Sequence, residues 1–258
     1  MAMSESRAAL VTGVGRRTGI GPELCRRLIE NGFRVCYSFW QPYDRQAPWV
    51  WEEGFSYAFE GELRAEGATA HALEIDLSLP ESPAILFRRA NELAGEISVL
   101  INNAAVSEMG GIDEINGAML DRHYAVNVRG MVLLTTEFVR QFHSSSGGRI
   151  INMTSGQGLG PMPDELAYAA SKGAVEAFST SLSPAVASRG ITVNAVNPGP
   201  TDTGWISDDL RETLLAQIPM GRIGAPRDVA NLVAFLVSEK GSWITGQVIN
   251  SEGGFWRK

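Results

Sequence analysis

The sequence has little cysteine, little histidine and no excess of positive charge. Its two cysteines, Cys25 and Cys36, provide neither a disulfide framework nor paired metal-ligand spacing. Each falls inside an expected helix or strand, so we expect two buried structural thiols. The three histidines, His71, His123 and His143, are scattered along the chain without ligand spacing, and we expect no metal site.

The formal net charge of −7 and the pI near 5.1 argue against nucleic acid or an anionic membrane surface as a partner. No apolar run approaches the length of a transmembrane helix. The N-terminal residues 1–7 lack the apolar stretch of a secretory leader. These absences predict a soluble cytoplasmic protein. The 258 residues, 44% hydrophobic, suffice for a sizeable core.

Apolar strand patterns alternate with helical patterns along the whole chain, with neither a linker nor an internal repeat. This alternation predicts an α/β fold: one doubly wound, Rossmann-type parallel sheet of seven strands with helices on both faces, a single domain over residues 1–258. Strands are expected at 8–12, 33–39, 69–75, 98–101, 150–153, 191–196 and 247–250, and helices at 22–30, up to 66, 81–93, 113–142, around 168–172 as far as 189, and 226–238.

Tyr168 and Lys172 stand four residues apart in a stretch with a helical pattern. In a helix they share one face, so their side chains meet. An ammonium beside a phenol favours the phenolate and lowers the phenol pKa, which would make Tyr168 a usable proton donor or acceptor near neutral pH. Ser155 follows an apolar strand and can offer a hydroxyl to the same reacting oxygen. Alone, such a tyrosine–lysine pair is also a common surface feature.

A glycine-rich turn, residues 12–21, connects the first strand to a helix with Pro22 at its start. Strand, glycine turn and helix are the context of a dinucleotide fingerprint, because glycines let the backbone approach a pyrophosphate. The N-terminus of the helix then supplies free N–H groups and the positive end of its dipole.

The end of the second strand bears on the choice between NAD and NADP. An NAD site needs an acid there for the ribose hydroxyls, but the sequence offers Ser38 and no acid until Asp44. Arg16 and Arg17 lie in the glycine turn and favour a 2′-phosphate, hence NADP(H) over NAD(H). The alternative is that both arginines simply face solvent.

Residues 40–60 are unusually rich in aromatic side chains. We expect a small local core there, with a flap over the adenosine half of a cofactor or a subunit contact as alternatives. The aromatic residues are Trp40, Tyr43, Trp49, Trp51, Phe55, Tyr57 and Phe59.

Several polar residues follow expected strands or interrupt apolar helices. Asp76 is placed to accept from an adenine amino group, or merely to cap a turn. Asn102 and Asn103 precede small residues and suit a backbone packed against a flat ligand. Asn127 lies in an apolar helix and needs a partner there, bending the helix and holding a water. Residues 202–220 are expected to form a substrate lid.

With these pieces in order, the chain resembles the short-chain dehydrogenase/reductase family over essentially its whole length. The matching positions are the glycine turn 12–21, Asp76, residues 102–105, Asn127, Ser155, Tyr168, Lys172 and residues 198–199.

The resemblance implies a role for each matching position. Tyr168 would exchange the proton of the substrate oxygen, Ser155 would hydrogen-bond that oxygen, and Lys172 would lower the Tyr168 pKa and bind the nicotinamide ribose. Asn127 would position a relay water. The implied cofactor-binding residues are Gly13, Gly15, Arg16, Arg17, Gly19, Ile20, Ser38, Asp76, Leu77, Asn103, Ala104, Ala105, Tyr168, Lys172, Pro198, Gly199, Thr201 and Thr203.

The sequence also departs from the family pattern. The glycine turn is two residues longer than usual, and Ala105 stands where glycine is common. Pro184 falls inside the helix of Tyr168, where a kink in a continuous helix costs about 3 kcal/mol. That helix often packs between subunits in the family, whose usual assembly is a tetramer.

Within the family, residues 218–224, 243–247 and 251–254 are similar to 3-oxoacyl-[acyl-carrier-protein] reductases of fatty acid biosynthesis. Such enzymes carry basic residues for an acidic carrier protein. They usually carry basic residues at two positions, just before the serine strand and at the end of the catalytic helix. At the first position this chain has His143 to Ser146, and at the second it has the basic residue Arg189. The leading hypothesis is an NADPH-dependent 3-oxoacyl reductase. The alternatives are a reductase of a small free ketone, alcohol or sugar, and a non-catalytic NADP-binding sensor.

Overall fold

The computed structural model describes residues 7–46 and 51–256. Two features singled out in the sequence, Trp49 and the segment before Arg7, lie outside these ranges.

A seven-stranded sheet forms the centre of the molecule, and every pair of neighbouring strands is parallel. Its strand order, β3-β2-β1-β4-β5-β6-β7, reverses direction beside β1, as a doubly wound sheet does. The predicted fold is therefore confirmed. The strands are β1 (Ala8–Thr12), β2 (Arg34–Phe39), β3 (Ala70–Glu74), β4 (Ile97–Asn102), β5 (Gly148–Met153), β6 (Ile191–Asn197) and β7 (Val248–Asn250).

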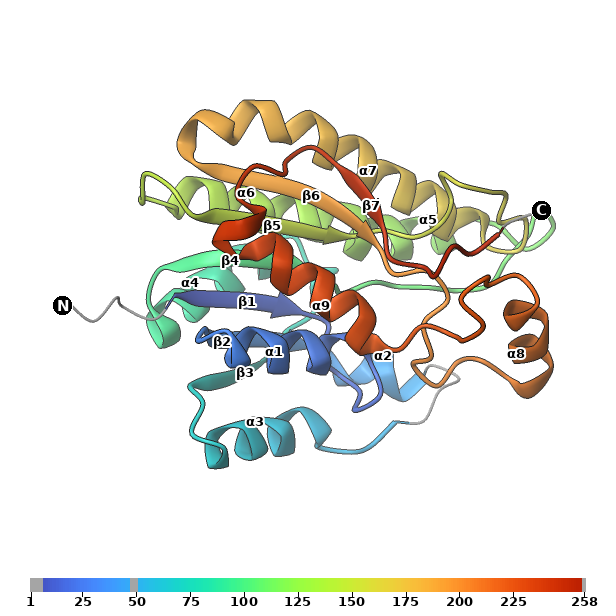
Figure 1. Cartoon of the computed structure of the whole chain (residues 1–258), viewed down its shortest axis with the longest axis horizontal. Coiled ribbons are helices and arrows are strands. Elements are labelled where there is room, and N and C mark those ends of the chain that lie inside the picture. The colour runs from blue at the N-terminus through green and yellow to red at the C-terminus, as the bar shows by residue number, and fades with distance from the viewer. Residues whose placement is uncertain (1–6, 47–50, 257–258) are drawn as a thin grey trace.

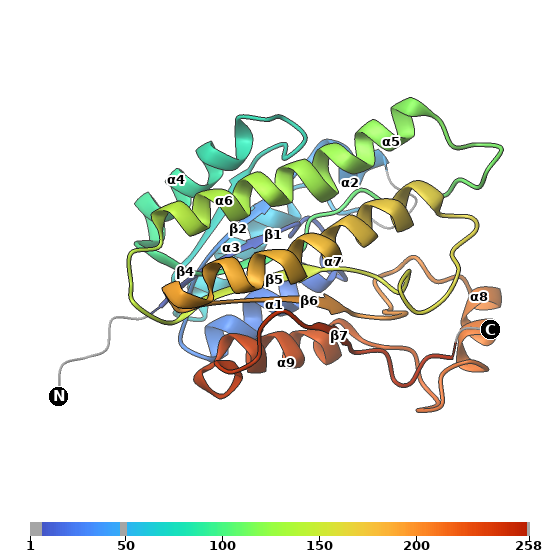
Figure 2. The same cartoon turned by 90° about the horizontal axis from the view of Figure 1, so that it is seen from above.

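Helices cover both faces of the sheet (Figures 1 and 2), and each face has its own apolar core. One face carries α1 (Ile20–Glu30), α3 (Phe55–Ala65) and α9 (Pro226–Val237), whose apolar sides pack on β1 and β2. The other face carries α4 (Ser82–Ala94), α6 (Met131–Gln141) and α7 (Leu166–Val186). Because parallel strands are covered on both faces, β1, β5 and β6 are buried along their whole length.

The predicted continuous helix over 113–142 is divided in three. It consists of α5 (Gly117–His123), a π-helical turn over Tyr124–Gly130, and α6. Asn116 is the N-cap of α5 and accepts a hydrogen bond from Met119 N at 3.0 Å. The π turn contains Asn127, whose side chain accepts a hydrogen bond from Val106 N, outside the helix. The predicted bend in the helix at Asn127 therefore takes the form of a π turn.

Pro184 lies in the last turn of α7, which continues through it to Val186. A 3₁₀ turn over Ala187–Arg189 follows, and Gly190 ends the element with a φ of 70°. Because proline removes only one backbone hydrogen bond near the helix end, the helix of Tyr168 is not interrupted.

The aromatic segment contributes to the main core rather than to a core of its own. Phe55 and Phe59 in α3 are buried and stack on each other at 5.5 Å between ring centroids. Tyr57 is half exposed, on the opposite side of the helix. The preceding residues form a short helix, α2 (Gln41–Gln46), which lies at the carboxyl end of the sheet (Figure 1).

Cys25 and Cys36 are both buried and free, as predicted. Over the described ranges, no helix has the length and hydropathy to cross a membrane. The expected lid contains α8 (Asp208–Leu215), whose Leu210 and Leu214 pack with Ile218 in a small apolar cluster.

Candidate active site

Three side chains expected to carry chemistry meet beyond the carboxyl end of β5. Ser155 follows β5 by two residues, and Tyr168 lies in the first turn of α7. Ser155 lies close enough to the Tyr168 hydroxyl to lower its pKa. Lys172, one turn further along α7, places Nζ 5.5 Å from the centroid of the Tyr168 ring. The structure thus brings together the serine, tyrosine and lysine that the sequence suggested.

The pKa of Tyr168 is raised in this structure, whereas the spacing of Tyr168 and Lys172 predicts that it is lowered. Burial raises the pKa of the Tyr168 phenol, and nearby Glu165 raises it further, whereas Ser155 lowers it. Lys172 Nζ lies over the ring and donates to the Met153 carbonyl at 2.8 Å. Burial lowers the pKa of Lys172 to about 8. Tyr168 is therefore a protonated acid at neutral pH, which suits proton donation.

His123 packs against Tyr168, a contact that no sequence pattern predicted. Its imidazole is fully buried and meets the Tyr168 ring edge-on at 6.3 Å between centroids. Its Nδ1 lies 2.8 Å from the Met119 carbonyl, and its Nε2 accepts from Glu108 N at 3.2 Å. These partners fit the neutral tautomer with the proton on Nδ1. His123 thus packs against the Tyr168 ring and restricts its orientation.

The Asn127 side chain connects three segments of the chain by hydrogen bonds. Its amide oxygen accepts from Val106 N at 2.7 Å, and its Nδ2 donates to the Val106 carbonyl and to Ser171 Oγ, both at 2.9 Å. Both amide hydrogens are thus used by protein groups. The side chain joins the segment after β4 to α7, one residue before Lys172. Its expected role in holding a relay water is untested by these contacts.

The glycine turn lies directly against the segment after β4. Asn103 Nδ2 donates to the carbonyls of Thr12 and Gly13 at 2.9 and 3.0 Å. A Cβ atom at Gly13 would lie 2.7 Å from the Ala104 Cα, and Gly13 has a φ of 77°. Only glycine fits this turn without strain. Asn102, in contrast, bonds Asn152 and Thr135 inside the core and has a structural role.

The N-terminus of α1 fits a dinucleotide phosphate. Gly19 is the N-cap and provides no side-chain acceptor for the first N–H groups of the helix. A Cβ atom at Gly21 would lie 2.6 Å from the Gly13 carbonyl oxygen, so helix and turn are in close contact. Ile20 anchors the first turn by packing on the core. Uncapped N–H groups on a glycine backbone are the donor set that a pyrophosphate requires.

Arg16 and Arg17 both have acidic partners. Arg17 is hydrogen-bonded to Glu52 and Glu62, all on the surface. Arg16 is mostly buried, lies 3.6 Å from an Asp44 carboxylate oxygen and donates to the Thr203 carbonyl at 3.1 Å. The alternative that both arginines merely face solvent is therefore wrong.

Helix α2 places the Asp44 carboxylate against the glycine turn. A Cβ atom at Gly15 would lie 1.8 Å from Asp44 Oδ2, so the carboxylate touches the turn itself. Burial raises the pKa of Asp44 to about 6, while Arg16 opposes that shift. From the same helix, the Tyr43 hydroxyl accepts from Ser107 N at 3.0 Å. Of the alternatives for the aromatic segment, these contacts favour a flap, because α2 packs against the glycine turn where a cofactor is expected.

The remaining predicted residues lie around the same edge of the sheet. Asp76 accepts from Ser78 N at 2.8 Å, which is the turn-capping alternative, and Leu77 packs against Gly130. Ser38 is buried and its carbonyl accepts from Val14 N. Ala105 precedes Val106, whose backbone N–H and carbonyl are hydrogen-bonded to the Asn127 side chain. In the segment after β6, Thr201 bonds the Pro198 and Gly199 carbonyls, and the Thr203 carbonyl accepts from Thr18.

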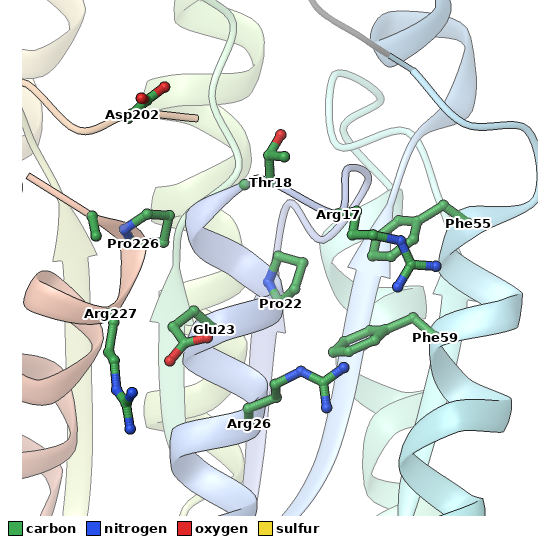
Figure 3. Close-up of a pocket in the computed structure, with 12 residues that line it drawn as sticks. Arg17, Thr18, Pro22, Glu23, Arg26, Phe55, Phe59, Asp202, Pro226 and Arg227 are labelled. Carbon is green, nitrogen blue, oxygen red and sulfur yellow. The ribbon is translucent and has the colours of Figure 1, made fainter. Parts of the chain in front are cut away.

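A cavity of about 400 Å³ opens beside the glycine turn (Figure 3). Arg17 and Arg26 lie over the rings of Phe55 and Phe59 on one side, and Pro226 and Asp202 lie on the other. Tyr168 does not line it, so this cavity is separate from the reacting group. Among residues 7–46 and 51–256, no cluster of three or more His, Cys, Asp or Glu side chains could hold a metal.

Comparison with known proteins gives matches over nearly the whole chain. The family model for enoyl-(acyl carrier protein) reductases matches residues 13–256. An uncharacterized oxidoreductase of Bacillus subtilis, YjdA, is 46% identical over the full length of both chains. The 3-oxoacyl-[acyl-carrier-protein] reductase FabG of Staphylococcus epidermidis is 32% identical over 97% of this chain and 99% of its own. A short-chain dehydrogenase of Burkholderia cenocepacia, solved with NADP, superposes with a TM-score of 0.86 at 30% identity, covering 97% of this chain and 98% of its own.

The contact between Asp44 and Gly15 predicts a pH-dependent stability. Because the folded-state pKa is raised from 3.8 to about 6, the ionised carboxylate destabilises the fold, and this cost grows as pH rises through that window. Asp44→Asn should therefore raise the free energy of unfolding at about pH 8 by up to about 3 kcal/mol. The gain should vanish near pH 4 in urea unfolding curves.

Asp121→Asn, at an exposed carboxylate on α5, is the matched control and should change little at either pH. An Asp44→Asn variant less stable than wild type at about pH 8 would show that the ion pair with Arg16 outweighs the burial of Asp44.

Proposed function

We propose that this chain, which belongs to the short-chain dehydrogenase/reductase family of oxidoreductases, interconverts a carbonyl and an alcohol at Tyr168 with NADP(H). The observation that carries the proposal is the placement of Ser155 beside the Tyr168 hydroxyl, with Lys172 Nζ over the phenol ring at 5.5 Å from its centroid.

The chemistry follows from the protonation states. In reduction, the Tyr168 phenol donates its proton to the substrate oxygen, and the Ser155 hydroxyl hydrogen-bonds that oxygen and stabilises its developing charge. The resulting phenolate lies beside the Lys172 ammonium, which stabilises it. When bound, the nicotinamide cofactor supplies the hydride. In oxidation the same groups act in reverse, and His123 and Asn127 hold the phenol and its helix as positioning residues.

NADP(H) is the cofactor that we propose over NAD(H). The complex of the Burkholderia relative with NADP supports this choice. Arg17 is half exposed at the rim of the glycine turn, and its partners Glu52 and Glu62 are solvated, so exchanging them for a 2′-phosphate costs little. Arg16 is instead tied to Asp44 and Thr203, which leaves Arg17 as the phosphate ligand.

Two substrate classes are consistent with this chemistry. The resemblance to the Staphylococcus reductase supports a 3-oxoacyl thioester carried on an acyl carrier protein. A free ketone, alcohol or sugar is favoured by the position of Arg189, which donates to the Val139 and Phe142 carbonyls at the end of α6. Arg189 lies at the opposite end of α7 from Tyr168, about 30 Å along the helix axis, and so does not serve the site mouth.

A non-catalytic NADP-binding sensor is the least supported alternative. Serine, tyrosine and lysine are all present beyond the end of β5, with Ser155 beside the Tyr168 hydroxyl and Lys172 over its ring.

Replacing Tyr168 tests the enzyme assignment. Tyr168→Phe should lower kcat at least about a thousandfold because it removes the transferable proton, yet leave NADPH binding unchanged. The measurement is NADPH consumption with acetoacetyl thioester and with a panel of free ketones and sugars, alongside a fluorescence titration of NADPH. Near wild-type turnover in the variant would contradict the proton-donor role. Tight NADPH binding without turnover of any substrate would support the sensor.

Replacing Arg17 tests the cofactor assignment. Arg17→Ala should raise KM for NADPH about tenfold and leave KM for NADH unchanged, since only NADPH carries the 2′-phosphate. Arg26→Ala is the matched control, because Arg26 also pairs with Glu62 and lies over a phenylalanine ring but is one helical turn or more from the glycine turn. Equal effects on both cofactors would place the phosphate elsewhere.

We propose a tetramer as the assembly, in keeping with the family habit. Support comes from exposed apolar side chains in the C-terminal part of the chain: Trp243, just before β7, is 97% exposed, and Val248 of β7 is also exposed. Light scattering should give four times the chain mass of 27.9 kDa, and Trp243→Glu should reduce it. A wild-type mass equal to one chain would exclude the tetramer.

A further inference from the structure

Three segments, together called the mouth, extend beyond the carboxyl edge of the sheet, the edge at which Ser155 and Tyr168 lie (Figures 1 and 2). They are residues 105–116 after β4, 155–167 between β5 and α7, and 201–220 after β6. The first two are joined by a short bridge between Gly110 and Glu165, in which Gly110 N donates to the Asp164 carbonyl at 2.7 Å. This bridge lies three residues before Tyr168, so it borders the reacting phenol.

These segments carry charge of almost one sign. They contain nine carboxylates but a single basic residue, Arg211, so an anion approaching the mouth meets a net negative field. Arg211 is itself paired with Asp202 at 2.5 Å. The carboxylates are Glu108, Asp113, Glu114, Asp164, Glu165, Asp202, Asp208, Asp209 and Glu212.

Some of these acids have cationic partners, and the two acids just before Tyr168 have none within the described residues. Glu108 pairs with Arg122 of α5. In the part of the chain that the structure describes, neither Asp164 nor Glu165 forms an ion pair. Burial raises the pKa of Glu165, and the neighbouring Asp164 raises it further. Because the acids of the three segments outnumber their arginine partners, the segments keep a net negative charge.

The same segments expose apolar side chains. Met109 and Ile112, on either side of Gly110, are 69% and 78% exposed. Leu159 and Trp205 are about half exposed, and the Trp205 indole donates to the Thr201 carbonyl, which fixes its ring in the third segment. Apolar surface of this extent gains free energy when a ligand covers it, at roughly 25 cal/mol per Å².

We propose that this site takes a free, uncharged, apolar carbonyl compound and rejects anionic ones, a carrier-bound thioester included. The inference rests on the proposed function and names the substrate class of that same site. An acidic carrier protein would meet like charge on the 105–116 and 155–167 segments, where association requires basic residues. A neutral 3-oxo ester or an apolar ketone covers Met109, Ile112 and Leu159 without that repulsion.

A matched substrate pair tests the proposal. Ethyl 3-oxohexanoate and the 3-oxohexanoate anion present the same reacting carbonyl and differ in charge. With NADPH, the ester should have a kcat/KM at least about tenfold above that of the anion. Raising the salt from about 0.02 to 0.5 M should increase kcat/KM for the anion several-fold and leave the ester unchanged, since ions screen the mouth.

A charge-neutral variant links the effect to the mouth. Asp164→Asn should raise kcat/KM for the anion and not for the ester. Glu92→Gln, at a surface acid on α4 remote from the mouth, is the control and should alter neither.

An anion reduced as well as the ester, a faster reaction with the acyl-carrier-protein thioester than with the ester, or a kcat/KM for the anion that falls with salt would each overturn the substrate class and leave the proposed function intact. Absence of turnover with all of these carbonyls, despite NADPH binding, would instead overturn the proposed function and this inference with it.

Discussion

A buried ammonium is the constraint on which the active site depends. Lys172 is almost completely inaccessible, and its charge is held by the Met153 carbonyl at the last residue of β5. A buried charge without a partner is costly, so this bond fixes the start of α7 relative to the strand. Tyr168 and Ser155 are placed by the same arrangement, one on the helix and the other just after the strand. The reactive geometry is therefore a property of the packing between α7 and β5.

Much of the fold could be predicted because its signals are local. The apolar strand runs, the glycine turn and the four-residue spacing of Tyr168 and Lys172 depend on neighbours in the chain. The features that were missed involve residues distant in sequence. His123 reaches Tyr168 from α5, and Asp44 reaches Gly15 from α2. The raised pKa of Tyr168 results from burial, which spacing alone does not reveal.

The same distinction applies to the cofactor and to the substrate. Arg16 and Arg17 are equivalent in the sequence, but the fold gives one a buried aspartate and the other two solvated glutamates. Arg189 keeps a position associated with carrier-protein docking, yet it caps α6 far from Tyr168. The overall charge of −7 does not indicate where the acids lie. Their gathering in three loops at one edge of the sheet emerges only when the strands are assembled.

The π turn over Tyr124–Gly130 has a consequence for which changes in chain length the site tolerates. A π turn accommodates one residue more than an α turn, and each α-helical residue advances the helix by about 100°. Deleting one residue there would let α5 and α6 merge into a single regular helix. Asn127 would then rotate away from Val106 and Ser171, while the apolar face of α6 kept its place on the sheet. Natural variation in length should therefore accumulate in the surface loops and spare this turn.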